Sequence, residues 1–88
     1  MLNWNMSDVK DPADLTRQQL IDVANEHIML YNNMIGSGNP NVRVGECKQL
    51  QRVWKAVAQA ASDGLTYKDM KPWPAMRREI WDAWAESQ

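Results

Sequence analysis

The clearest pattern of hydrophobic and polar positions runs from residue 15 to residue 35, LTRQQLIDVANEHIMLYNNMI. Apolar side chains recur there every three or four residues, which is the spacing of one face of an α-helix. That face comprises Leu20, Ala24, His27, Tyr31, Met34 and Ile35, and it is flanked by Ile21, Val23, Ile28 and Leu30. The apolar arc covers about half of the circumference, more than a surface helix needs. We therefore expect this helix to be the central element, with later segments packed on both sides of it.

The residues around position 16 have the chemistry of a helix start. The Thr16 hydroxyl can accept a hydrogen bond from the first turn, and Gln19 can reach back to complete a capping box. Leu15 and Leu20 have the spacing of a hydrophobic staple. The run Gly36-Ser37-Gly38-Asn39-Pro40 then supplies a stop and a turn. The pattern predicts a helix over residues 16–35.

A second helix is predicted to end at residue 62, but its start is ambiguous. Asn39 and Pro40 could be the N-cap and first helical residue, whereas Gly45 disfavours the early turns. From Glu46 the helical pattern is clear, so we expect residues 45–62. Its apolar stripe is Cys47, Leu50, Trp54, Val57, Ala58 and Ala61. A basic stripe of Lys48, Arg52 and Lys55 lies about 100° away on the same helix.

A short turn over residues 66–71 and a last helix over residues 74–86 complete the predicted elements. Thr66 and Asp69 repeat the capping device, and Pro74 suits a first helical position. One face of the last helix collects Trp73, Met76, Ile80, Ala83 and Trp84. We expect Trp73 and Trp84 to belong to the core. Trp81 lies off that face, on the side of Arg77 and Arg78.

Residues 1–14 are predicted to form an arm rather than a helix. Leu2, Trp4 and Met6 alternate with Asn3 and Asn5, a period of two. An extended arm laid on the helical core is the interpretation that we favour, and a strand added to a partner's sheet is the alternative. The expected fold is an all-α, small three- to four-helix bundle with an N-terminal extended arm. Residues 15–88 form its single helical domain.

Composition limits the chemistry that this chain can support. Its 88 residues include one cysteine, which excludes an internal disulfide and a cysteine-based zinc cage. The sequence lacks a signal-peptide pattern and a membrane-spanning apolar run, so we expect a cytoplasmic protein that does not contact membranes. The net charge of −1 disfavours a dedicated nucleic-acid binder. Residues 39–62 are the basic part, with four basic side chains against one acidic.

No residue cluster points to catalysis or to a cofactor. The chain has one histidine and no glycine-rich phosphate loop, G-x-S-x-G elbow or H-E-x-x-H motif. We expect His27 to be a core histidine with one hydrogen-bond partner, for which Tyr31 is a candidate. Cys47 is expected to be a small buried hydrophobic residue.

The C-terminal cluster of Trp and Arg is the strongest indication of function, since these side chains most often anchor protein interfaces. We expect a non-enzymatic protein-interaction module that binds a larger protein, and a homodimer with Trp81 packed across it is the alternative contact that we leave open. An accessory or inhibitor protein of viral or mobile-element type fits this size. The alternative is a small DNA-associated helical protein that uses the basic stripe. The predicted partner-binding residues are Trp81, Arg77, Arg78, Lys48, Arg52 and Lys55.

Overall fold

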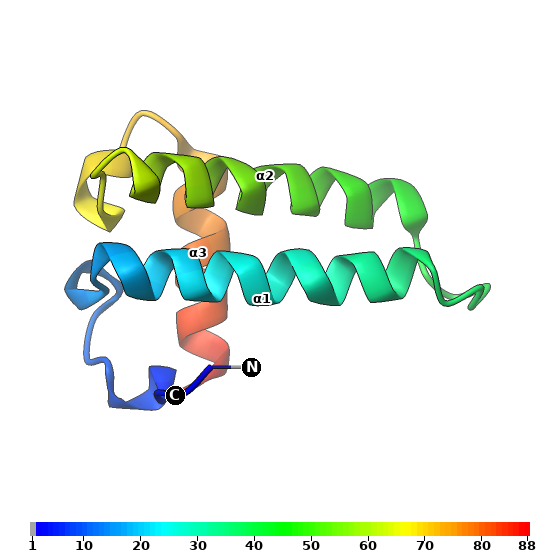
Figure 1. The fold of residues 1–88 in the computed structure, drawn as a ribbon, viewed down its shortest axis with the longest axis horizontal. Coiled ribbons are helices and arrows are strands. Elements are labelled where there is room, and N and C mark those ends of the chain that lie inside the picture. The colour runs from blue at the N-terminus through cyan, green and yellow to red at the C-terminus, as the bar shows by residue number, and fades with distance from the viewer. Residues whose placement is uncertain (1) are drawn as a thin grey trace.

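A computed structural model describes residues 2–88, and every regular element in that range is helical. The three α-helices are α1 (Arg17–Ile35), α2 (Val44–Ser62) and α3 (Pro74–Glu86). Three short 3-10 helices are η1 (Met6–Asp8), η2 (Pro12–Asp14) and η3 (Tyr67–Met70). In Figure 1, α1 and α2 form an antiparallel hairpin, and α3 crosses behind both helices. The all-α prediction is confirmed, with three α-helices rather than four across these residues.

The start of α1 is the one that its capping residues predicted. The Thr16 hydroxyl accepts from the Gln19 backbone N–H at 3.1 Å, and the Gln19 side-chain oxygen accepts from the Thr16 N–H at 2.9 Å. Leu15 and Leu20, on either side of this box, are both buried. The same device works in η3, where an Asp69 carboxylate oxygen accepts from the Thr66 N–H at 2.9 Å.

The helix α2 begins at Val44, so Asn39 and Pro40 are not its cap. The Asn39 side chain instead accepts from the Asn41 backbone N–H at 2.9 Å, which closes a turn before the helix. Arg43 occupies the N-cap position without a side-chain hydrogen bond. Gly45 therefore lies within the first turn, where its flexibility costs less than in a helix interior.

The core lies where α3 crosses the hairpin. Its largest fully buried side chains are Trp54, Leu15, Leu20, Met70, Ile80, Val23 and Val57. The prediction that later segments pack on both sides of α1 holds only in part, because α1 packs mainly against α2 and α3 covers only part of the hairpin. Leu30 and Met34, in the second half of α1, are therefore 50% and 41% exposed.

The N-terminal arm packs on the helices, as we favoured, but it is not fully extended because η1 and η2 fold it into two turns. Met6 is buried, and Leu2 and Trp4 contact the core. The Trp4 indole N–H donates to Asp22 at 3.1 Å, and the Trp84 indole N–H donates to the Val9 carbonyl at 2.7 Å. These two bonds fix the arm to α1 and to α3.

Two tryptophans of the predicted core differ in their burial. Trp84 is half-buried against the core, as expected. Trp73 is 47% exposed, so its assignment to the core is wrong. The physical reason is its position: Trp73 precedes Pro74 as the N-cap of α3, with a non-helical backbone, and so it does not share the helical face of Met76 and Ile80.

Candidate protein-interaction surface

Trp81 lies on the outer side of α3, and 48% of it is exposed. It follows the buried Ile80 by one residue, which rotates its side chain about 100° away from the core. Its ring contacts the ring of Trp84, with centroids 5.2 Å apart and planes tilted by 54°. Trp84 is itself held by the Val9 carbonyl, so Trp81 has a fixed aromatic support on one side.

Arg77 links α3 to the preceding 3-10 helix η3. Its guanidinium carbon lies over the Tyr67 ring, 4.3 Å from the ring centroid, a cation–π arrangement. The Arg77 Nε atom is buried and has no hydrogen-bond acceptor among the described residues. The stack on Tyr67 holds the guanidinium in place, and its outer N–H groups stay available to an acceptor from outside the fold.

A hollow of about 360 Å³ brings these groups together. It is lined by Tyr67, Lys71, Pro74, Arg77, Arg78 and Trp81, and we call this set the α3 outer surface. Three of the six carry a positive charge, and none carries a negative charge. Within residues 2–88, the sole ion pair at 4.0 Å or less is Arg43–Glu46, so the three cations have no paired carboxylate.

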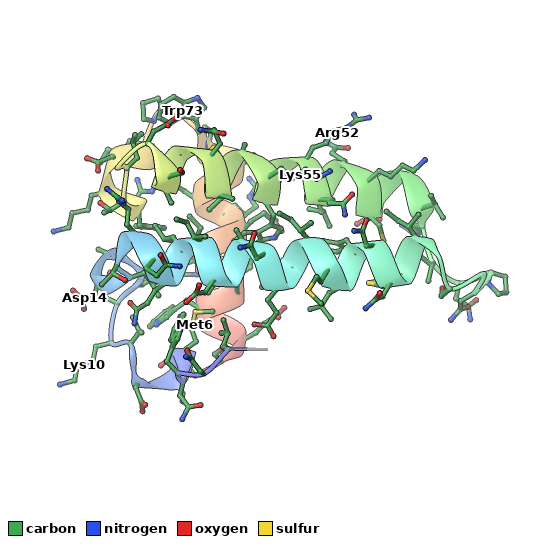
Figure 2. All side chains as sticks on the ribbon, viewed as in Figure 1. Met6, Lys10, Asp14, Arg52, Lys55 and Trp73 are labelled. Atoms are coloured by element: carbon green, nitrogen blue, oxygen red, sulfur yellow. The ribbon has the colours of Figure 1, made fainter. Side chains whose placement is uncertain are left out.

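The structure separates the six residues that we predicted for partner binding into two groups. Trp81, Arg77 and Arg78 lie together on α3, whereas Lys48, Arg52 and Lys55 are exposed along α2. In Figure 2, Arg52 and Lys55 are labelled along α2 of the hairpin. None of the three lines the hollow around Trp81. The basic stripe is thus a separate surface from the α3 outer surface.

Sequence patterns missed two members of the α3 outer surface, Tyr67 and Lys71. Both precede α3, and only the turn after η3 brings them beside Arg77. Helical periodicity could not find them, because it relates residues within one helix. It also missed Gln51, a buried polar residue whose amide donates to the Ile28 carbonyl at 3.0 Å and to Asn32 at 2.6 Å.

His27 is a half-buried residue at the crossing of the three helices. Its Nδ1 lies 2.9 Å from the Val23 carbonyl, which can only accept, so Nδ1 is the protonated nitrogen. The Tyr31 ring centroid is 6.4 Å away, so Tyr31 is not the hydrogen-bond partner that we considered. The imidazole stacks instead on the Trp54 indole at 4.3 Å.

Glu79 of α3 faces the same crossing. Burial, and then the charge of Asp82, raise the pKa of its carboxyl, while His27, Trp54 and Arg78 each oppose that rise. The Trp54 Nε1 atom is buried and has no acceptor of good geometry in residues 2–88, so its effect on Glu79 acts through a weak contact. This cluster is therefore a packed polar contact between helices.

The described residues hold no group of three His, Cys, Asp or Glu side chains arranged to bind a metal ion. None of the helices in residues 2–88 has the length and apolar character required to cross a membrane. No known protein family, curated protein or solved structure matches the chain.

Proposed function

We propose that this chain is a non-enzymatic interaction module, an accessory or inhibitor protein that binds a larger protein through the α3 outer surface. The observation that supports this proposal is the half-exposed Trp81 beside three cations that lack a carboxylate partner. The partner segment would carry acidic side chains around one apolar side chain. The carboxylates would meet Lys71, Arg77 and Arg78, and the apolar group would cover the Trp81 indole.

The magnitudes are consistent with an anchor residue. A tryptophan buries about 200 Å² in full, so covering the exposed half of Trp81 removes about 100 Å² from water. At about 25 cal/mol per Å², this contributes about 2.5 kcal/mol to binding. Arg77 adds to the effect because its stack on Tyr67 already restricts the side chain, and less conformational entropy is lost on binding.

The test compares single variants of the purified protein as bait in a cell lysate. Trp81→Ala and Arg78→Glu change the α3 outer surface, and Arg52→Glu is the matched charge control on α2. Circular dichroism first establishes that all variants keep the wild-type helix content. Any protein that is retained by wild type and Arg52→Glu, but not by the two surface variants, is then purified and titrated against each variant by calorimetry.

We expect a purified partner whose affinity falls about tenfold or more on Trp81→Ala. The separate Arg78→Glu variant should also bind this partner more weakly, by a factor that depends on the salt concentration. Retention that does not depend on Trp81 would refute the proposal. The DNA-associated alternative gives a different result in the same experiment. Nucleic acid would then be retained at low salt, released at moderate salt, and lost on Lys48→Glu combined with Arg52→Glu.

A further inference from the structure

The helix α2 presents charge of one sign to solvent. The basic stripe Lys48, Arg52 and Lys55 is exposed, and its members follow one another at intervals of four and three residues, so they share one face. With a rise of 1.5 Å per residue, this row of cations is about 10 Å long. Between Glu46 and Asp63 the chain has no acidic residue, so nothing along the helix offsets the stripe.

The adjoining face of α1 does not offset the stripe either. The Gln51 amide of α2 donates to the Asn32 side chain at 2.6 Å, which identifies the face of α1 beside α2. Two turns earlier on that face stands Asn25, which is also uncharged. The α1 carboxylates Asp22 and Glu26 instead line a hollow with the N-terminal arm. The cations of the basic stripe therefore face solvent with their charge uncompensated.

An exposed tryptophan lies at the C-terminal end of the stripe. Trp73 is 47% exposed, and it lines a hollow of about 320 Å³ together with Ala56 and Gln59 of α2. Ala56 follows Arg52 by one helical turn, and Gln59 follows Lys55 by one turn, so the hollow borders directly on the stripe. In Figure 2, Arg52, Lys55 and Trp73 all lie along the α2 edge of the molecule.

The hollow beside Trp73 is mainly apolar. Leu65 and Met76 contribute to its lining, and Asp63 is the one carboxylate in it. That carboxylate accepts from the Gln59 amide at 3.1 Å and so already has a hydrogen-bond partner. None of the ring contacts within residues 2–88 involves Trp73. We call the basic stripe and Trp73 together the α2 outer surface.

We propose that the α2 outer surface binds single-stranded nucleic acid, with phosphates along the three cations and one base stacked on Trp73. Every nucleotide carries one phosphate charge and one flat ring, so a single strand fits a row of cations that ends in an indole in any register. A duplex keeps its bases paired and would leave the indole uncovered. An acidic peptide would match this order of groups only with one particular sequence.

The local charge of this surface matters more than the net charge of the chain. Exposed charges further away than about 10 Å are largely screened at 0.1 M salt, so the net charge of −1 has little effect at the stripe. The α2 outer surface also shares no residue with the α3 outer surface. It is a second binding surface, and its role does not depend on the function proposed above.

The test is fluorescence anisotropy of a labelled oligodeoxythymidylate of about 12 nucleotides, titrated with the purified protein at several salt concentrations. The variants are Lys48→Glu combined with Arg52→Glu, Trp73→Ala, and Trp73→Phe, which keeps a ring. Trp81→Ala is a closely matched control, because Trp81 is 48% exposed and Trp73 is 47% exposed. Circular dichroism first establishes that each variant keeps the wild-type helix content.

Three phosphate contacts predict that the logarithm of the association constant falls with the logarithm of salt concentration with a slope of about −2. The double charge reversal should abolish binding. Trp73→Ala should weaken binding about tenfold without changing the slope, Trp73→Phe should weaken it less, and Trp81→Ala should bind as wild type does.

Three results would overturn the proposal. The first is an absence of binding at low salt. The second is a Trp73→Ala variant that binds as wild type does, or an equally tight complex with a hairpin duplex, because the contact would then involve phosphates alone. The third is equally tight binding of a labelled polyglutamate peptide, which would show that the surface attracts any polyanion.

Discussion

The imidazole of His27 stacks on the indole of Trp54, with ring centroids 4.3 Å apart and planes 21° apart. This contact joins α1 to α2 at the level where α3 crosses them. Trp54 is fully buried, and the His27 Nδ1–H is held by the Val23 carbonyl. The stack thus fixes the place at which the hairpin and α3 form one core, and it accounts for the only histidine of the chain as a structural residue.

Replacement of Trp54 should show how much of the fold depends on this crossing. Trp54→Ala is expected to lower the free energy of unfolding by about 3–5 kcal/mol, through lost burial and a cavity. Trp54→Phe should cost clearly less, about 1–2 kcal/mol, since it keeps an apolar ring and removes an indole N–H that has no good acceptor. Urea denaturation followed by far-UV circular dichroism measures both values. An equal cost for the two variants would mean that the N–H makes a stabilising bond.

The capping box of α1 gives a prediction of smaller size. Thr16→Ala removes the hydroxyl that accepts from the Gln19 N–H, and should destabilise the protein by about 1 kcal/mol. In a domain of this length, that loss lowers the thermal midpoint by about 4–8 °C. Ser62→Ala, an exposed change in the last turn of α2, serves as the control and should have little effect. An equal effect of the two changes would argue against the capping box as a stabilising feature.

Local chemistry made the helix starts predictable, whereas the arrangement of the helices was not. The Thr16–Gln19 box and the burial of Met76, Ile80 and Ala83 follow from spacing within one segment. The exposure of Leu30 and Met34 depends on where α3 crosses, and no pattern within α1 specifies that position. The prediction that Trp73 belongs to the core was wrong for a related reason. It applied the helical spacing of α3 to Trp73, which precedes Pro74 and lies outside the helix.

The α3 outer surface was likewise predictable only for the residues that lie within α3 itself. The phase of α3 places Trp81 and Arg78 outside the core face, and periodicity is sufficient for that. The contribution of Tyr67 and Lys71 required the path of the chain between η3 and α3.

Glu79 provides a test through pH. Burial raises the pKa of its carboxyl above the ordinary value of 4.5, which means that the folded protein binds this proton more tightly than the unfolded chain. Its stabilising contribution is therefore fully present below the unfolded pKa and is lost as the pH rises through the folded pKa. At neutral pH, the ionised carboxylate is less favourable to the fold than a neutral group of the same shape.

Glu79→Gln should accordingly raise the thermal midpoint at pH 7, and the difference from wild type should shrink as the pH is lowered below the pKa of Glu79. The measurement is thermal unfolding from neutral to acidic pH, at one fixed protein concentration. Glu26→Gln, in the hollow between the arm and α1, is the matched control for removal of a carboxylate. A less stable Glu79→Gln variant at pH 7 would mean that the electrostatic attraction of His27 and Arg78 for the charged form outweighs the cost of burial. The carboxylate would then stabilise the crossing of the three helices.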